Sequence, residues 1–208
     1  MPELTTIGIF LTAAIILAIT PGPGILYVLT RSIKGGRTEG LFSTLGTSIG
    51  GLFHIIIAAF GLSAILATSA FAFSIVKYVG AAYLIYLGIR TLMGNDTIEI
   101  SSSTYQTNKR VALKQGIITE ILNPKTALFF LAFIPQFINP EGNVALQFIF
   151  LGSIVVLLNS LVDLIVAFLA GPFGKFLMEN VKLRQGQRLF SGFALIALGA
   201  YVAFIDNE

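Results

Sequence analysis

The sequence contains apolar runs long enough to cross a lipid bilayer, and a proline-glycine stretch breaks the first of them: Thr20, Pro21, Gly22, Pro23 and Gly24. Each proline lacks an amide proton, so the carbonyls of Leu17 and Ile19, four residues earlier, lose their helical partners. An unsatisfied backbone group in hydrocarbon costs several kcal/mol. A broken helix is tolerated there only where it is buried in protein or lines a polar cavity. The stretch therefore predicts one wall of a solute site.

The composition indicates that the chain needs lipid as its solvent. Of the 208 residues, 55% are apolar and 11% are charged, whereas about a quarter of the residues in a soluble domain are charged. The chain has no cysteine and a net charge of +3, which argue against disulfides, thiolate metal sites and nucleic-acid binding. Residues 1–3 lack the basic residues of a signal peptide, so we expect the first run to be retained.

Six segments have room for the roughly 20 residues that a membrane helix requires. They comprise residues 4–30, 38–67, 74–93, 114–138, 144–172 and 188–205. We therefore predict an all-α membrane protein with six transmembrane helices, of which the first and fourth are broken by proline. A polar segment, residues 95–113, is expected to link residues 1–94 to residues 114–208.

Basic residues gather in the first, third and fifth loops, at Arg31, Lys34, Arg37, Lys109, Arg110, Lys175, Lys182, Arg184 and Arg188. Such loops face the cytoplasm. Both termini are then expected on the extracytoplasmic side. Lys77 is the one basic residue on the other side, where a position at a helix end would let it reach the interface.

The two halves of the chain resemble each other. Pro21 and Pro124 lie 103 residues apart, and an apolar run follows each of them. Each half holds three spans, so the second half must insert upside down. An inverted repeat with paired helix breaks is typical of a secondary transporter whose site lies between the repeats. The alternative is coincidence, because proline and glycine are common in membrane helices.

Few polar side chains are predicted at mid-membrane depth: His54, Asn123, Lys125, Asn159 and Asp163. Ionisable groups there need a partner or a water-filled cavity. We expect an ion pair between Lys125 and Asp163, which is either a moving part or a permanent bridge. Glu39 and Glu120 are expected at the cytoplasmic helix ends, as solvated or paired charges.

His54 is the only histidine. Histidine titrates near neutral pH, which suits a proton relay, and Asp163 is a second candidate for proton coupling. Alternatively, His54 bonds a carbonyl on a neighbouring helix. No second ligand lies at helical spacing from it, so we expect no metal site.

Asn123, Pro124 and Lys125 form the second break, where Pro124 leaves the carbonyl of Glu120 unpaired. The half-helices that begin after the two breaks would point positive dipole ends into the cavity and, with Lys125, suit a carboxylate. Asp163 and the freed carbonyls suit an ammonium. We therefore predict a site for a zwitterionic amino acid, formed by both breaks with Asn159 and Asp163. No cofactor is expected.

Several segments, taken together, resemble the LysE/RhtB family of bacterial amino-acid exporters: Thr20 to Pro23, Lys77 to Leu84, Leu87-Gly88 and Leu122 to Lys125. The resemblance covers nearly the whole chain. It implies an inner-membrane exporter of amino acids such as threonine, homoserine, leucine or lysine, driven by the proton gradient.

We expect a secondary exporter with alternating access rather than an enzyme. An intramembrane enzyme is the first alternative, and it would need a second carboxylate or a similar group near Asp163 and Lys125. A channel or scaffold is the second alternative, and it would form its pore in a homo-oligomer. A homo-oligomeric state is left open.

Overall fold

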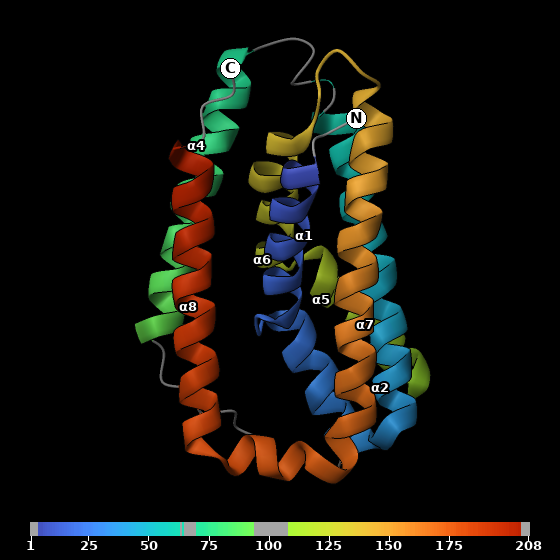
Figure 1. Ribbon diagram of the computed structural model, residues 1–208. Coiled ribbons are helices and arrows are strands. Elements are labelled where there is room, and N and C mark those ends of the chain that lie inside the picture. Colours follow the sequence, from blue (N-terminus) through green and yellow to red (C-terminus); the bar gives the residue numbers. More distant parts are fainter. Residues whose placement is uncertain (1–3, 63, 65–69, 94–107, 205–208) are drawn as a thin grey trace.

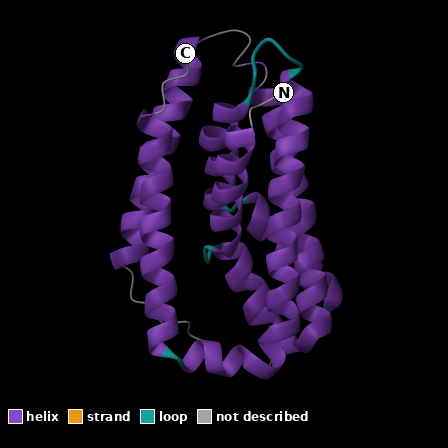
Figure 2. Ribbon diagram, viewed as in Figure 1, coloured by secondary structure: helices purple, strands orange, loops and turns teal. Residues whose placement is uncertain are grey.

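The computed structural model describes residues 4–62, 64, 70–93 and 108–204, and every regular element among them is helical (Figure 2). The predicted all-α membrane class is confirmed. The elements are α1 (Leu4–Ile19), α2 (Pro23–Ile57), the π-helix η1 (Ala58–Leu62), α4 (Ala70–Met93), α5 (Lys109–Ile121), α6 (Pro124–Leu128), the π-helix η2 (Phe129–Phe133), the 3₁₀-helix η3 (Ile134–Phe137), α7 (Val144–Glu179) and α8 (Val181–Phe204). Most of the predicted linker, residues 94–107, lies outside the described residues.

The apolar helices account for the predicted spans. Among the described residues, 4 helices are long and apolar enough to cross a membrane: Pro23–Leu62, Ser74–Met93, Lys109–Phe137 and Val144–Ala170. Thr6–Ile19 and Arg188–Phe204 are shorter apolar helices. The first predicted span is divided, as expected, between α1 and the start of α2.

The first predicted loop, residues 31–37, is almost wholly helical, which corrects the expectation of a separate loop. Gly36 has φ 75° and ψ −179° and is the one non-helical residue inside α2. Glycine adopts this positive φ without the steric cost that a Cβ would bring. The chain reverses its direction at Gly36, so α2 has a descending arm and an ascending arm (Figure 1).

The helices pair across the two halves of the sequence. The helix α4 packs along α8, and α2 packs along both α5 and α7. The helices α1 and α6 lie in the middle of the molecule between these groups (Figure 1). The first residues of α1 and the last residues of α8 lie at the same end of the molecule (Figure 1). Which side of a membrane this end faces stays a prediction.

Glycines allow the paired helices to approach closely. A Cβ atom on Gly116 of α5 would lie 2.7 Å from the carbonyl oxygen of Ser43 in α2. A Cβ atom on Gly88 of α4 would lie 2.6 Å from the carbonyl oxygen of Gly192 in α8. A Cβ on Gly46 would overlap the backbone of α5. Only small residues permit such backbone packing.

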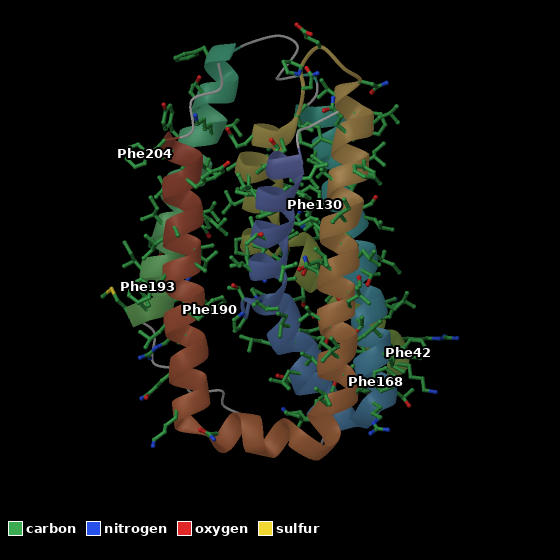
Figure 3. The ribbon with its side chains drawn as sticks, viewed as in Figure 1. Phe42, Phe130, Phe168, Phe190, Phe193 and Phe204 are labelled. Carbon is green, nitrogen blue, oxygen red and sulfur yellow. The ribbon has the colours of Figure 1, made fainter. Side chains whose placement is uncertain are left out.

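Apolar side chains lie both inside and outside the molecule. Inside, the rings of Phe129 and Phe133 stack with centroids 4.6 Å apart, and Phe10 meets Phe137 edge-on at 5.3 Å. Outside, Phe193 is 61% exposed and Phe204 is 84% exposed (Figure 3). A surface this apolar suits the hydrocarbon of a bilayer, whereas in water it would cause aggregation.

Lys77 does not lie at a helix end, which corrects the expectation that it reaches the interface. The helix α4 begins at Ala70, two turns before it. The Lys77 side chain is buried, and its Nζ lies 5.6 Å from the centroid of the Tyr78 ring. Of the other basic residues, Lys175 and Arg184 have side chains outside the described part of the chain.

Candidate functional site

The two helix breaks face each other inside the molecule. The first separates α1 from α2 at residues 20–22, and the second separates α5 from α6 at residues 122–123. A Cβ atom on Gly22 would lie 3.1 Å from Cε of Lys125, and one on Gly24 would lie 2.7 Å from Oε2 of Glu120. A larger residue at Gly24 would collide with that carboxylate. The two breaks can therefore lie this close together only because small residues occupy positions 22 and 24.

Lys125 satisfies the carbonyls that the first break exposes. Its Nζ donates to the carbonyl oxygen of Leu17 at 2.8 Å and to that of Thr20 at 2.7 Å. Pro21 leaves the Leu17 carbonyl without its usual helical donor, as predicted. These carbonyls also form the negative end of the α1 dipole, which attracts an ammonium group. The stem of Lys125 crosses the break over Gly22.

The expected ion pair between Lys125 and Asp163 is absent from the described residues, so this prediction is wrong for the conformation seen here. Asp163 instead accepts a hydrogen bond at Oδ2 from Thr47 Oγ1, 2.7 Å away. Lys125 instead binds the carbonyls of Leu17 and Thr20, which the break deprives of their usual helical donors.

His54 adds a donor to the carbonyl at the second break. Its Nε2 lies 2.8 Å from the carbonyl oxygen of Glu120, which loses its usual helical donor at Pro124 and also accepts from the N–H of Asn123 at 3.0 Å. The imidazole ring lies 5.8 Å from the Phe130 ring, between centroids. Of the two interpretations of His54, the bond to a carbonyl on a neighbouring helix is the one present.

Glu120 belongs to the site, which corrects its predicted place at a cytoplasmic helix end. The residue is 5% exposed. Its carboxylate accepts hydrogen bonds from Asn123 Nδ2 at 2.9 Å and from Thr126 Oγ1 at 2.6 Å. The helix α5 begins at Lys109, earlier than expected, so Glu120 lies in its last turn beside the break. Glu120 is also the second carboxylate that the sequence had not revealed near Asp163 and Lys125.

Asp163 points an unpaired oxygen toward the same place. The residue is 4% exposed, and within the described chain its Oδ1 has no hydrogen-bond partner, while Oδ2 binds Thr47. Asn159 precedes it by one turn of α7 and so lies on the same face of that helix. The Asn159 side chain also has no hydrogen bond to described residues. These two polar groups are thus available to a ligand.

A small polar cavity lies where these residues meet. Its volume is about 20 Å³, room for about one water molecule. Five of the predicted site residues line it: Gly24, Asn123, Lys125, Asn159 and Asp163. Thr20, Pro21, Gly22, Pro23 and Pro124 shape the breaks without lining the cavity, and His54 also lies outside its wall.

Sequence analysis missed several lining residues: Thr47, Ser48, Glu120, Thr126 and Ser160. Serine and threonine occur throughout membrane helices, where their hydroxyls bond the backbone one turn earlier, so composition does not single them out. Ser160 does so here, through a 2.7 Å bond to the carbonyl of Val156. It also lies 2.7 Å from Ser48 Oγ, across the interface of α2 and α7.

A larger cavity, of about 510 Å³, lies between α1, η3 and α7. Its lining is almost wholly apolar and includes Phe10, Phe137 and Phe150. Phe150 is 67% exposed, so this cavity borders the lipid-facing surface. It offers no charged group to a polar ligand, which leaves the smaller cavity as the candidate site.

Packed groups lie between the small cavity and each end of the molecule (Figure 1). Toward one end lies the phenylalanine core of η2 and η3. Toward the other, Arg31 Nη1 pairs with Glu39 Oε2 at 3.1 Å, and Arg31 also donates to Gln115 of α5. Tyr27 OH donates to the carbonyl of Ala112 at 2.7 Å. Glu39 was expected to be either solvated or paired with a basic residue. It is paired with Arg31, and its side chain is buried.

The fold and the site define an all-α, multi-pass membrane protein in which two broken helices enclose a polar cavity, the architecture of a membrane transporter. Residues 15–205 match the family described as LysE type translocator, and the chain belongs to this family. The resemblance seen in the sequence is thus confirmed. Membership makes the protein a transporter rather than an enzyme.

Relatives of similar length are found in several bacteria. The chain is 32% identical to the uncharacterized membrane protein YrhP of Bacillus subtilis, over 91% of this chain and 94% of that protein. It is 28% identical to an uncharacterized membrane protein of Vibrio cholerae, over 87% and 88% of the two chains. It is also 28% identical to the homoserine/homoserine lactone efflux protein of Salmonella typhimurium, over 93% and 94%. No solved structure matches the chain.

Proposed function

We propose that this protein exports amino acids or close derivatives across the bacterial inner membrane, in exchange for protons, with the small polar cavity as its cargo site. The observation that carries this proposal is that the two proline breaks meet around a cavity lined by Glu120, Lys125 and Asp163. Buried ionisable groups are costly in a membrane protein unless they serve a substrate or ion pathway.

The cargo class follows from the polar groups and from a relative. The unpaired Oδ1 of Asp163 is a partner for an ammonium group, and the Asn159 amide adds a neighbouring donor and acceptor. The Salmonella relative is named for efflux of homoserine and homoserine lactone. Threonine, homoserine, leucine and lysine are therefore the first cargoes to test.

Alternating access is the proposed mechanism, because the cavity is too small for the cargo. A cavity of about 20 Å³ does not hold an amino acid, so cargo binding requires the helices to separate on one side. The packing of α2 on α7 and of α4 on α8 supports an inverted repeat, since each contact joins residues 1–94 to residues 114–208. Rocking of one repeat against the other would then open the cavity to each side in turn.

Asp163 is the stronger of the two candidates for proton coupling. It faces the cavity with one unpaired oxygen, whereas His54 lies behind Glu120 and is held by its carbonyl. A proton on Asp163 and an ammonium group beside it would compete for the same carboxylate. That competition is sufficient to exchange a proton for cargo. The basic loops would face the cytoplasm, and both termini would lie outside.

Export from intact cells tests the proposal. Cells that overproduce the protein should release specific amino acids, identified by profiling the medium without preselection. Asp163→Asn keeps the shape of the side chain and removes its charge, and we expect it to reduce export at least about tenfold. Glu141→Gln makes the same chemical change on an exposed loop residue and should export normally. An extracellular profile equal to that of cells without the protein would contradict the proposal.

A further inference from the structure

We propose that the site recognises the amino group of its cargo and not the carboxylate, and that Glu120 imposes this selectivity. The inference rests on the proposed function and names its substrate class. That class is primary amines of amino-acid size, whether the carboxyl group is free or masked as an amide, ester or lactone. It departs from the zwitterion site that the sequence predicts.

The position that would attract a cargo carboxylate already faces a carboxylate of the protein. The helix α2 begins beside the cavity, and its N-cap, Gly22, offers no side chain to the first amides. The N–H groups of Gly24 and Ile25 would attract an anion, because a helix N-terminus favours negative charge. Glu120 Oε2 lies against Gly24, within 2.7 Å of the position of a Cβ atom there.

Glu120 is held firmly in this position. Asn123 and Thr126 each donate a hydrogen bond to one of its two oxygens, at 2.9 Å and 2.6 Å. Two oxygens that both accept are the arrangement of an ionised carboxylate. At the second break, the first amide of α6, that of Lys125, is already capped by Asn123 Oδ1 at 3.1 Å.

The nearest ammonium is also committed within the protein. Lys125 Nζ donates to the carbonyls of Leu17 and Thr20, so two of its three donors are in use. The charged side chains that line the cavity are Glu120 from α5, Lys125 from α6 and Asp163 from α7, and α2 lines it with Thr47 and Ser48. One ammonium thus faces two carboxylates.

The Oδ1 atom of Asp163, which has no partner in the described chain, favours a cationic group on the cargo. Asp163 is a buried residue whose Oδ1 accepts no hydrogen bond within the described chain, and an ammonium group would complete its hydrogen bonding. A carboxylate on the same cargo would approach Glu120, and two like charges repel strongly in a medium of low dielectric constant. The amino group is therefore required, whereas the carboxylate is at best tolerated.

Transport by the purified protein in liposomes tests this inference. The vesicles are loaded with L-homoserine, L-threonine, L-leucine or L-lysine, with the carboxamide of each, or with the N-acetyl form of each. We expect each carboxamide to leave within about threefold of the rate of its free amino acid, or faster. N-acetylation should slow transport at least about tenfold, because a buried acceptor built for an ammonium then stays unpaired.

The outcomes separate this inference from the proposed function. Transport of free amino acids with a tenfold or greater loss for the carboxamides would overturn the inference and leave the proposed function in place. Normal transport of the N-acetyl forms would overturn the inference as well. If neither the free amino acids nor their carboxamides leave the vesicles, the proposed function fails and the inference fails with it.

The role of Glu120 has a test of its own. Glu120→Gln keeps the size of the side chain and removes its charge. We expect the ratio of free-acid to carboxamide transport to rise about tenfold or more in this variant. Glu141→Gln, the matched change in an exposed loop, should keep the wild-type ratio. An unchanged ratio in a Glu120→Gln protein that still transports would overturn the role of Glu120. The comparison of cargoes with the unaltered protein does not depend on this variant.

Discussion

Lys125 Nζ donates to the carbonyl oxygen of Leu17 over 2.8 Å, and that carbonyl is the acceptor that Pro21 leaves without a helical partner. The contact joins the two breaks, which are far apart in the sequence. It also fixes the ammonium at the negative end of the α1 dipole. His54 plays the matching part at the other break, where its Nε2 lies 2.8 Å from the carbonyl oxygen of Glu120.

Lys125→Met should destabilise the protein, because it leaves the Thr20 carbonyl without a donor and the Leu17 carbonyl with only the 3.2 Å bond from the N–H of Thr20. A buried acceptor left unpaired costs about 1–3 kcal/mol, and we expect a loss of that size. Unfolding in detergent measures this loss. The double variant with Pro21→Ala is the control, because an alanine at 21 returns an N–H to the Leu17 carbonyl. The cost of Lys125→Met should fall by about 1 kcal/mol in that background. Equal costs in both backgrounds would contradict the assignment.

His54→Gln should retain transport, and His54→Leu should not retain full stability. Glutamine carries a side-chain N–H that can replace Nε2 as donor to the Glu120 carbonyl, whereas leucine cannot. The Glu120 carbonyl keeps its bond from the N–H of Asn123, so we expect His54→Leu to cost about 0.5–1.5 kcal/mol of unfolding free energy, the net value of one hydrogen bond. The dependence of transport on pH should be unchanged in His54→Gln, because Asp163 and not His54 is the proposed proton carrier. A loss of proton-driven transport in His54→Gln would instead make His54 the proton carrier.

Arg31 and Glu39 should behave as a coupled pair. Their side chains are 11% and 2% exposed, and the removal of one partner from a buried ion pair costs about 3–5 kcal/mol. We therefore expect Glu39→Gln and Arg31→Gln each to lower stability in detergent. The double variant should cost less than the sum of the two single variants. Strict additivity would show that the pair does not stabilise this end of the molecule.

Pro124→Ala should impair transport without loss of stability. Alanine supplies an N–H that can reach the Glu120 carbonyl and continue α5 into α6, which would move Glu120 and Lys125 relative to the first break. Pro124 is the first residue of α6, where a missing N–H costs little, so the variant should unfold about as easily as the wild type. We expect export to fall at least about fivefold, on the order of 1 kcal/mol. Full export from a variant of unchanged stability would show that the break is incidental.

Much of the architecture follows from local chemistry in the sequence. Proline removes a donor wherever it occurs, so both breaks and the freed carbonyls of Leu17 and Glu120 were predictable. Local chemistry does not show which side chain donates a hydrogen bond to each freed carbonyl. We expected Lys125 to pair with Asp163, because both were predicted at a similar depth in the membrane. Depth does not show whether the ammonium binds a carboxylate or two backbone carbonyls.

The place of Glu120 illustrates the same limit. An α-helix rises about 1.5 Å per residue, so the predicted depth of a side chain depends directly on where its helix begins. The structure begins α5 at Lys109 with Asn108 as its cap, whereas the apolar pattern suggested a start at Lys114. That shift takes Glu120 from the end of the helix to the middle of the molecule. The cap is formed by a polar residue in the linker, where hydropathy gives little guidance.

The central claim is that cargo reaches the small polar cavity from both sides of the membrane, and thiol labelling tests it most directly. The chain has no cysteine, so Asn159→Cys places a single thiol in the wall of the cavity. We predict that a membrane-impermeant thiol reagent modifies it from either side of oriented vesicles, and that a transported amino acid slows the modification. Labelling from one side only, or labelling that cargo does not slow, would contradict the account.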